Sequence, residues 1–472
     1  MCYDQDVSTQ THHSPIPESV DVSTNSIRID PSKCVDCKRC VRACKNIAGQ
    51  KVLKVGPLGD HPAAIQTTNG KPLQETNCIK CGQCTLYCPV GAITENSQVR
   101  EVMSSIKNHQ RKAYVCQINP SVHIALADAF GVSPSVLTPG KVASALRIIG
   151  FDKVYDTRFG GDILIMEEAA QLVERLKDKK SNSPFLASAC PAFINYIEQS
   201  RSPFIPNLST ARSAPAILAS LIREVLPQQL NLHPEDIYSV YVTTCLAKKD
   251  EIERPTHSSP SGVKDTDVSL SIRELIELFR QSNINVHELE ESKFDFLLGG
   301  TQGGEQASGA AAILDTAGGL MEAVLRTANW MLTGKSPKNL EMKALRGDKA
   351  QKVTEVQMGD IKFQVAAVQG MANAMKLFDK IKKDKKLKEI KYIEVMACQG
   401  GCVCGGGSVM PADKDAMNER VKAVYEDDKA CKVRCAHESS AVTDLYQNFL
   451  EKPNSHKAHD LLHTHFAQRP GF

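Results

Sequence analysis

Eight of the seventeen cysteines in this chain fall in two matching blocks near the N-terminus. Each block has the spacing C-x-x-C-x-x-C-x-x-x-C, and Pro89 follows the second. Three thiolates at two-residue gaps can bind one 4Fe–4S cubane, whereas the fourth lies too far along the chain and ligates the other cluster. The sequence therefore predicts two clusters with crossed ligands, the first held by Cys34, Cys37, Cys40 and Cys88 and the second by Cys78, Cys81, Cys84 and Cys44.

A pair of zinc sites is the alternative for these blocks. Zinc takes four ligands per ion, typically from two C-x-x-C pairs, so a tandem triple followed by a distal cysteine favours iron–sulfur clusters. The spacing resembles that of bacterial two-cluster ferredoxins, but Lys45 follows Cys44 where proline is more usual, and the 33 residues between the blocks suggest an inserted loop. Two such clusters conduct electrons, so a second site must use them.

Four further cysteines are predicted to meet at strand ends. Cys190, Cys245 and the pair Cys398 and Cys402 each follow a predicted strand, and an open α/β sheet places its ligands at the carboxyl ends of its strands. The run from Gly400 to Gly407 is glycine-rich, which lets the backbone approach a bulky group closely, and it lacks the lysine of a phosphate-binding loop. Four thiolates converging there would hold a third cubane, although buried free cysteines are also common.

The elements that must position these cysteines alternate between short strands and helices from about residue 106 onward. Apolar runs predict strands at 114–118, 184–188, 239–243, 295–298 and 392–396. Helical spacing predicts helices at 141–149, 163–176 and 211–225, with a further helix starting at 119–121 and a solvated helix face at 380–391. This alternation predicts an α/β fold with parallel strands.

The composition divides the chain into three parts. Residues 1–25 are polar without periodicity, which predicts a disordered tail. Residues 26–105 should form the small α+β ferredoxin-like domain, and residues 106–472 should form the α/β body. Within 26–95, ten Lys and Arg residues outnumber five Asp and Glu residues, so this is the basic part of the molecule.

Composition and charge exclude several classes of protein. With 472 residues, 42% hydrophobic and 24% charged, the chain is neither wholly disordered nor a collagen-like fibre. A net charge of +3 is too mild for a dedicated nucleic-acid binder. No apolar run approaches the ~20 residues of a membrane span, and a signal-peptide core is missing. We expect a cytoplasmic protein with reduced thiols, bound neither to a membrane nor to nucleic acid.

Three segments around the four body cysteines resemble the signature motifs of iron-only (FeFe) hydrogenases. They are ASACPAF, TTCLAKKDEIERP and EVMACQGGCVCGGG, and the resemblance extends to VYDTRFGGDILIMEEAAQLV, TAGGLMEAVLRTA and HESSAVTDLYQNFLEKPNSHKAHDLLHTHF. It covers nearly the whole chain after residue 26. The resemblance implies a catalytic body with two parallel or mixed sheet lobes around a buried metal cluster.

The resemblance also implies the H-cluster, a 4Fe–4S cubane joined to a diiron subcluster that carries CO, cyanide and a dithiolate. Cys190, Cys245, Cys398 and Cys402 would ligate the cubane, and Cys402 would bridge to the diiron half. Lys248 would bind one cyanide by a charge-assisted hydrogen bond, and Pro120 and Ser121 match the segment that meets the other. Met396 would pack beside the cubane.

The proton relay departs from the family pattern. Catalytic members have a proton-passing cysteine where this chain has Ala189, whose methyl group cannot carry a proton. Glu168 and Ser209 match relay positions, but Gln171 stands where a second glutamate is usual. Further departures are Thr243-Thr244, Ala214-Pro215, Cys404 and Ser408. Acid–base assistance is typically worth about 10²–10⁴-fold, so slow catalysis is expected. Cys404, two residues past a ligand, is a candidate substitute carrier.

Three functions follow from these observations. The first is an enzyme that interconverts 2H⁺ + 2e⁻ and H₂, matured by hydrogenase maturation proteins, with an acidic ferredoxin or similar carrier docking on the basic 26–95 region. The second is a sensory hydrogenase-like protein, since such relatives show the same change to alanine. The third is a non-catalytic iron–sulfur assembly factor of the related family, which shares the S-A-C-P motif but usually retains one N-terminal cluster. The ligands for both clusters favour the enzyme.

Four cysteines remain outside these sets, namely Cys2, Cys116, Cys431 and Cys435. The spacing Cys431-x-x-x-Cys435 suits a metal pair, but without recognisable partners ordinary reduced thiols are the preferred interpretation. His459, His463 and His465 lie in the hydrogenase-like C-terminal segment and are expected to pack rather than to bind metal.

Overall fold

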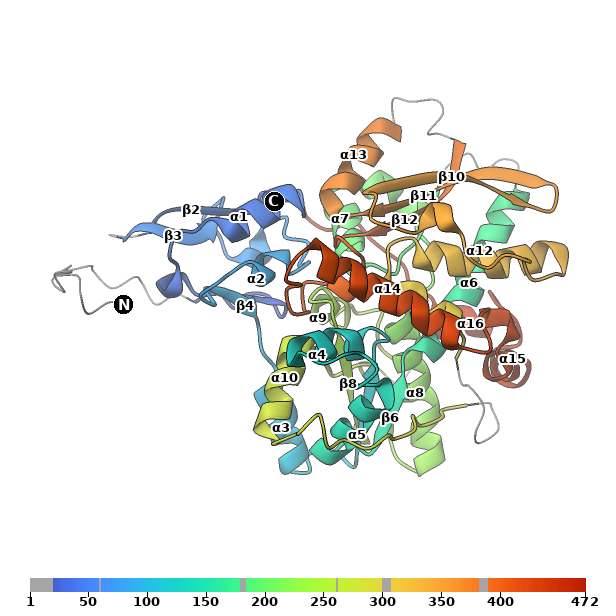
Figure 1. Ribbon diagram of the computed structural model, residues 1–472, viewed down its shortest axis with the longest axis horizontal. Helices are drawn as coiled ribbons and strands as arrows, with labels where there is room; N and C mark the ends of the chain where they lie inside the picture. Colours follow the sequence, from blue (N-terminus) through green and yellow to red (C-terminus); the bar gives the residue numbers. More distant parts are fainter. Residues whose placement is uncertain (1–19, 59–60, 179–183, 260–261, 299–306, 382–388) are drawn as a thin grey trace.

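The computed structural model describes residues 20–472 except 59–60, 179–183, 260–261, 299–306 and 382–388. Figure 1 shows a small N-terminal lobe beside a larger body of helices and sheets. Among the helices in the described part of the chain, none is long and apolar enough to cross a membrane.

The small lobe contains two short antiparallel pairs of strands and two short helices. Strand β1 (Ile27–Ile29) pairs with β4 (Ile93–Glu95), and β2 (Leu53–Leu58) pairs with β3 (His61–Thr67). Helix α1 (Arg39–Asn46) carries Cys40 and Cys44, and α2 (Gln83–Leu86) carries Cys84. Ile27, Ile65 and Leu73 fill a small core that the cysteines border. The lobe is the expected α+β unit.

The first sheet of the body is fully parallel, as the alternating pattern predicts. Its strands lie in the order β6 (Lys153–Asp156), β5 (Ala113–Ile118), β8 (Ile237–Thr243) and β9 (Val268–Ser271). Along β5, Ala113 and Val115 join one core, whereas Tyr114 and Cys116 join another, because successive side chains point to opposite faces. Helices α6 (Arg158–Lys177) and α8 (Ala214–Leu230) cover the first face. The second face carries α3 (Val99–Lys107), α4 (Val122–Phe130), α5 (Pro139–Ile149) and α10 (Ile272–Gln281).

The second sheet is mixed. The hairpin β10 (Gln351–Met358) and β11 (Ile361–Gln369) is followed by β12 (Ile390–Met396) and β7 (Phe185–Leu186), which run parallel to β11. Helix α12 (Gly319–Thr333) shares a core with one face of β11, and α7 (Pro191–Ser200) and α13 (Met371–Ile381) share a core with the other. The remaining α-helices are α9 (Lys248–Glu251), α11 (Gly309–Ala312), α14 (Lys414–Ala430), α15 (Ser440–Leu445) and α16 (His456–Leu462).

Local sequence explains where several of these helices begin. Thr138 caps α5 through a bond from the Lys141 amide, and Pro139 follows at the first helical position. Ser271 and Glu274 form a reciprocal capping box at the start of α10. The cap of α10 places its start directly after strand β9.

The strand predicted at 295–298 is wrong. Asp295 N donates to Val154 O at 2.8 Å, as an edge strand would, but the Val154 amide bonds to the Asp295 carboxylate at 2.9 Å. Arg147 and Lys153 pair with the same carboxylate. The aspartate side chain therefore takes the place of the next backbone hydrogen bond between the two segments, and strand pairing stops.

The predicted domain boundaries can be compared with the structure at both ends of the small lobe. Asp21, inside the segment expected to be a disordered tail, bridges to Ile29, whereas residues 1–19 lie outside the described part. The boundary at 105 falls within α3, whose Val99 and Val102 belong to the body core. Most of the charged run at 380–391 lies outside the described residues.

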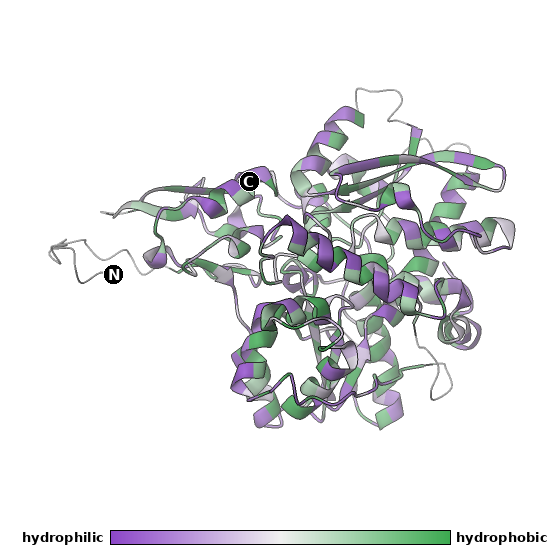
Figure 2. Ribbon diagram, in the orientation of Figure 1, coloured by the Kyte–Doolittle hydropathy of each residue, from purple (hydrophilic) through white to green (hydrophobic). Residues whose placement is uncertain are grey.

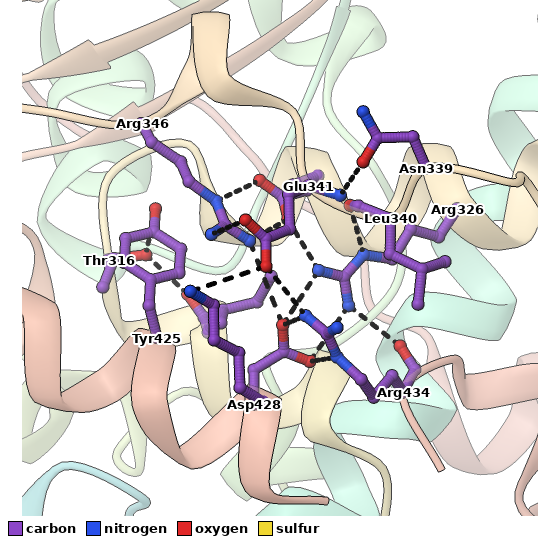
Figure 3. Close-up of polar contacts among 12 residues, drawn as sticks. Thr316, Arg326, Asn339, Leu340, Glu341, Arg346, Tyr425, Asp428 and Arg434 are labelled. Carbon is purple, nitrogen blue, oxygen red and sulfur yellow. Dashed lines mark hydrogen bonds and ion pairs between the residues drawn. The ribbon is translucent and has the colours of Figure 1, made fainter. Parts of the chain in front are cut away.

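A buried network of arginines and carboxylates ties α12 to α14, as Figure 3 shows. Asp428 accepts hydrogen bonds from Arg326 and Arg434, and Glu322 accepts from Arg326 and Arg346. Figure 2 shows that α14 is otherwise mostly hydrophilic. The network therefore holds a largely polar helix against the body.

Candidate metal centre

The structure brings the cysteines of the two blocks together in a crossed arrangement. The pKa of Cys40 is raised to about 12, chiefly by burial and also by the neighbouring Cys88, Cys34 and Cys37. Burial likewise raises the pKa of Cys84 well above its usual value, with contributions from Cys78 and Cys44. The fourth cysteine of each block thus lies beside the other block, as the spacing argument expects. That these groups ligate clusters stays a prediction.

The second block touches the body directly. The Gln83 side-chain amide donates to Sγ of Cys398 at 3.2 Å, and the Thr85 hydroxyl donates to Gly406 O at 3.1 Å. A Cβ on Gly406 would lie 2.1 Å from Cys81 O, so only glycine permits this approach. The loop that carries Cys81 and the glycine-rich loop that carries Gly406 are therefore in direct backbone contact.

The four body cysteines line one cavity. Cys190 caps α7 after β7, Cys245 follows β8, and Cys398 and Cys402 follow β12. The pKa of Cys245 is raised to about 12, chiefly by burial and also by Cys190. The pKa of Cys402 is also raised well above its usual value, by burial and by Asp315. Thiolates so disfavoured by burial need a cation to offset their charge.

The lining of the cavity suits a metal cluster held by thiolates. Its walls are mostly apolar, and Met396 lines it as expected. Ala189, Pro120 and Pro215 line the same space and offer no proton carrier. A buried, apolar-walled space edged by four thiols is what a metal cluster with a bulky second half requires.

Two polar groups expected in this pocket already have partners within the protein. Lys248 lines the cavity, and its ammonium pairs with Glu251 at 2.6 Å. The Ser121 amide donates to Asp315 Oδ2 at 3.1 Å, and its hydroxyl donates to Asn119 at 2.9 Å. Cyanide binding by Lys248 and Ser121 stays a prediction, and it would compete with these bonds.

Glu168 lies buried on α6 beside the body cavity's sheet. The Tyr392 hydroxyl donates to Glu168 Oε1 at 2.5 Å. Burial raises the pKa of Glu168 to about 7, while the Tyr392 and Ser209 hydroxyls act to lower it. A carboxyl that titrates near neutral pH suits proton transfer. Gln171, in contrast, accepts bonds from Thr210 and cannot titrate.

Two buried carboxyls that the sequence reasoning missed also line the cavity. The Gly318 and Met321 amides both donate to Glu394 at 2.7 Å, and burial raises the pKa of Glu394 to about 7. Burial also raises the pKa of Asp315. Glu394 lies near the end of β12, just before Met396. Its position at a strand end, directly before a cysteine motif, is the sequence feature that could have identified it. Asp315 ends the short 3-10 helix Ile313–Asp315 and has no such feature.

Comparisons with known proteins agree with this geometry. Residues 112–406 match the family model for the iron-only hydrogenase large subunit, C-terminal domain, residues 414–469 match the iron hydrogenase small subunit, and residues 33–93 match a 4Fe-4S dicluster domain.

Two curated relatives show different sides of this similarity. The NADP-reducing hydrogenase subunit HndD of Solidesulfovibrio fructosivorans is 34% identical over 95% of this chain and 76% of its own length. Cytosolic iron-sulfur assembly component 3 of Mus musculus is 30% identical over 84% of each chain. Among solved structures, a variant of the FeFe-hydrogenase HydA1 from Chlamydomonas reinhardtii superposes with a TM-score of 0.70 at 30% identity, covering 80% of this chain and all of that one.

Proposed function

Because this chain belongs to the iron-only hydrogenase family, we propose that it is an oxidoreductase that interconverts protons and electrons with H₂. Electrons would be exchanged with a ferredoxin or similar carrier through the two N-terminal clusters, and the rate would be low because Ala189 replaces the proton-passing cysteine. We propose a cytoplasmic location and maturation by dedicated hydrogenase maturation proteins.

The observation that carries the proposal is the contact between Gln83 and Cys398. It joins the second cysteine block to a thiol of the cavity in which H₂ would be made. An electron path that ends on a cavity cysteine is needed when electrons are consumed there. A protein that only carries a cubane has no need of it.

The residues have the following proposed roles. Cys190, Cys245, Cys398 and Cys402 would hold the H-cluster, which when bound supplies the iron at which protons and H₂ are interconverted. Pro120, Ser121 and Lys248 would line the second half of the cofactor, and Met396 would pack beside the cubane. The Lys248 ammonium, now paired with Glu251, offers a positive charge to an anionic ligand.

Proton supply would depend on Glu168 and Ser209, which lie together on the side of Tyr392. Glu168 can hold or release a proton near neutral pH, and Ser209 can relay it. Ala189 lines the cavity and offers only a methyl group where the proton-passing cysteine is usual. Without a titrating group there, proton delivery would be slow.

An infrared spectrum of the anaerobically purified, matured protein tests the proposal. Bands where metal-bound CO and cyanide absorb are the expected result. Absence of these bands would contradict the proposal and favour the assembly factor, provided that the protein holds enough iron for three cubanes and that the maturation system works on a control hydrogenase.

The assembly factor is the second candidate, because Ser121 and Lys248 already bind Asp315 and Glu251. Similarity to cytosolic iron-sulfur assembly component 3 supports it as well. The sensory alternative shares the cofactor, and the H₂ production rate separates it from an enzyme.

A further inference from the structure

Cys435, His437 and Glu438 form a cluster of potential metal ligands outside the large cavity. Their ligand atoms all lie within 4.8 Å of one another. The Cys435 residue is 1% exposed and the His437 side chain 2% exposed, whereas the Glu438 side chain is 43% exposed. Two inner ligands and one outer ligand would leave a metal ion accessible from solvent.

The local backbone explains why these residues meet. Cys435 precedes a 3-10 helix at Ala436–Glu438. This helix has three residues per turn, so side chains three apart lie on the same side. Cys435 and Glu438 therefore face the same way, and His437 completes the set.

The spacing of the ligand atoms is close to that of a tetrahedral site. Nε2 of His437 lies 3.8 Å from Oε1 of Glu438. Zinc bonds of about 2.0–2.1 Å at tetrahedral angles place two such atoms about 3.4 Å apart. The Ser336 hydroxyl lies between them, 2.9 Å from Nε2 and 2.6 Å from Oε1.

The imidazole is held in a fixed orientation. Its Nδ1 bonds to the Thr327 hydroxyl at 3.2 Å, and its ring stacks on Trp330 with centroids 4.7 Å apart. A metal-binding histidine is typically held in this way through its other ring nitrogen. Burial lowers the pKa of His437, which favours the neutral form that binds metals.

The environment of the thiol disfavours its negative charge. The pKa of Cys435 is raised to about 12, chiefly by burial and also by the Glu438 carboxylate, while Arg326 and Arg434 act to lower it. Both arginines are engaged by Asp428, as Figure 3 shows. A divalent cation would offset the thiolate and the carboxylate together.

We propose that Cys435, His437 and Glu438 bind one zinc ion through Sγ, Nε2 and a carboxylate oxygen, with the Ser336 hydroxyl or a water as the fourth ligand. One thiolate, one imidazole and one carboxylate are ligands that zinc accepts, whereas iron–sulfur clusters need more thiolates. Binding forms the zinc–sulfur bond and releases the thiol proton to solvent. The ion would join the end of α12 to the segment after α14. This proposal does not depend on hydrogenase activity.

Zinc content and zinc K-edge absorption of the anaerobically purified holoprotein test the site, because this edge is blind to the iron of the clusters. The expected result is one zinc per chain, with one sulfur at about 2.3 Å and nitrogen or oxygen neighbours at about 2.0–2.1 Å. Cys435→Ser and Glu438→Gln should each weaken zinc binding at least about tenfold. Cys431→Ser, the matched control, should retain it.

Three results would overturn the proposal. The first is a coordination shell of four sulfurs, which would place the zinc in a cluster site. The second is unchanged zinc binding by Cys435→Ser. The third is failure of the protein to retain zinc when one equivalent of the ion is added. The fluorescence of Trp330, the chain's single tryptophan, gives an independent readout because the indole stacks on His437. Added zinc should change its emission in the wild type and leave Glu438→Gln, a half-exposed and fold-neutral variant, unchanged.

Discussion

Gln83 and Cys398 lie 315 residues apart, yet the Gln83 amide donates a hydrogen bond to the Cys398 sulfur at 3.2 Å. Hydrogen bonds to cluster sulfurs tune reduction potentials, because a donor stabilises the more negative, reduced state. Gln83 therefore belongs to the electronic environment of the cavity although it lies in the small lobe.

Gln83→Met keeps the side-chain length and removes the donor. We expect the midpoint potential of the body cubane to fall by about 40 mV, since a difference of about 1 kcal/mol between the two redox states corresponds to that shift for one electron. A redox titration followed by electron paramagnetic resonance measures it. Gln66→Met, an exchange in the same lobe where the amide bonds Pro57 O, should leave the potential unchanged. Equal shifts in both variants would exclude a specific role for Gln83.

Ala189→Cys should accelerate H₂ production by the matured protein. A thiol with a pKa near 8.5 can exchange protons, and acid–base assistance is worth about 10²–10⁴-fold. Ala189→Ser is the control, because a hydroxyl of similar size does not titrate in this range. The assay compares rates at equal H-cluster content, measured by infrared absorption. Equal rates for wild type and Ala189→Cys would show that proton supply through this position is not limiting.

Glu168→Gln should change how stability depends on pH. The pKa of Glu168 is about 7 in the folded chain, against 4.5 ordinarily, so the folded state holds a proton that the unfolded state has lost between these values. Its contribution to stability is fully present below pH 4.5 and is lost as the pH rises through 7.

The glutamine variant should therefore match the wild type near pH 5 and exceed it near pH 8 by up to about 3 kcal/mol. Thermal unfolding midpoints at the two pH values measure the difference. Glu174→Gln, on the exposed side of α6, should show no such divergence. A constant offset between Glu168→Gln and wild type across this range would refute the assignment.

Asp428→Asn should destabilise the body by about 3–5 kcal/mol. The carboxylate is fully buried and pairs with Arg326 and Arg434, and its loss leaves buried positive charge uncompensated. Denaturant unfolding followed by circular dichroism measures the effect. Asp415→Asn on the exposed side of α14 changes the net charge equally and should stay within about 0.5 kcal/mol of the wild type. Similar losses in both variants would mean that helix charge, rather than the network, is responsible.

Sequence patterns predicted four of the described strands, β5, β7, β8 and β12, and the grouping of the cysteines. The crossed placement, with Cys44 beside the second block and Cys88 beside the first, was predicted because a fourth cysteine four residues further on lies too far from the cluster of its own block. Strands β5 and β8 are buried along their whole length, so their prediction depended on β-branched and aromatic content rather than on alternation. Such features are encoded locally, within a few residues.

The partners of buried charges could not be predicted in this way. Lys248 finds Glu251 on its own short helix, but Ser121 meets Asp315 across 194 residues. Asp295 terminates strand pairing by bonding Val154 from a distant loop. In each case the tertiary fold selects the partner, and the sequence around either residue carries no sign of the other.

The backbone contact between Gly406 and the loop at Cys81 and Gly82 constrains how electrons can travel. Some redox proteins deliver electrons with a domain that swings between a donor and an acceptor. Here the two loops lie too close for a side chain to separate them, and the Lys80–Asp250 ion pair at 2.6 Å fastens the same junction. In the proposed function the small lobe would therefore be a fixed conductor, so its tunnelling distance would stay constant during turnover and any regulation of electron flow would act on the docking of the outside carrier.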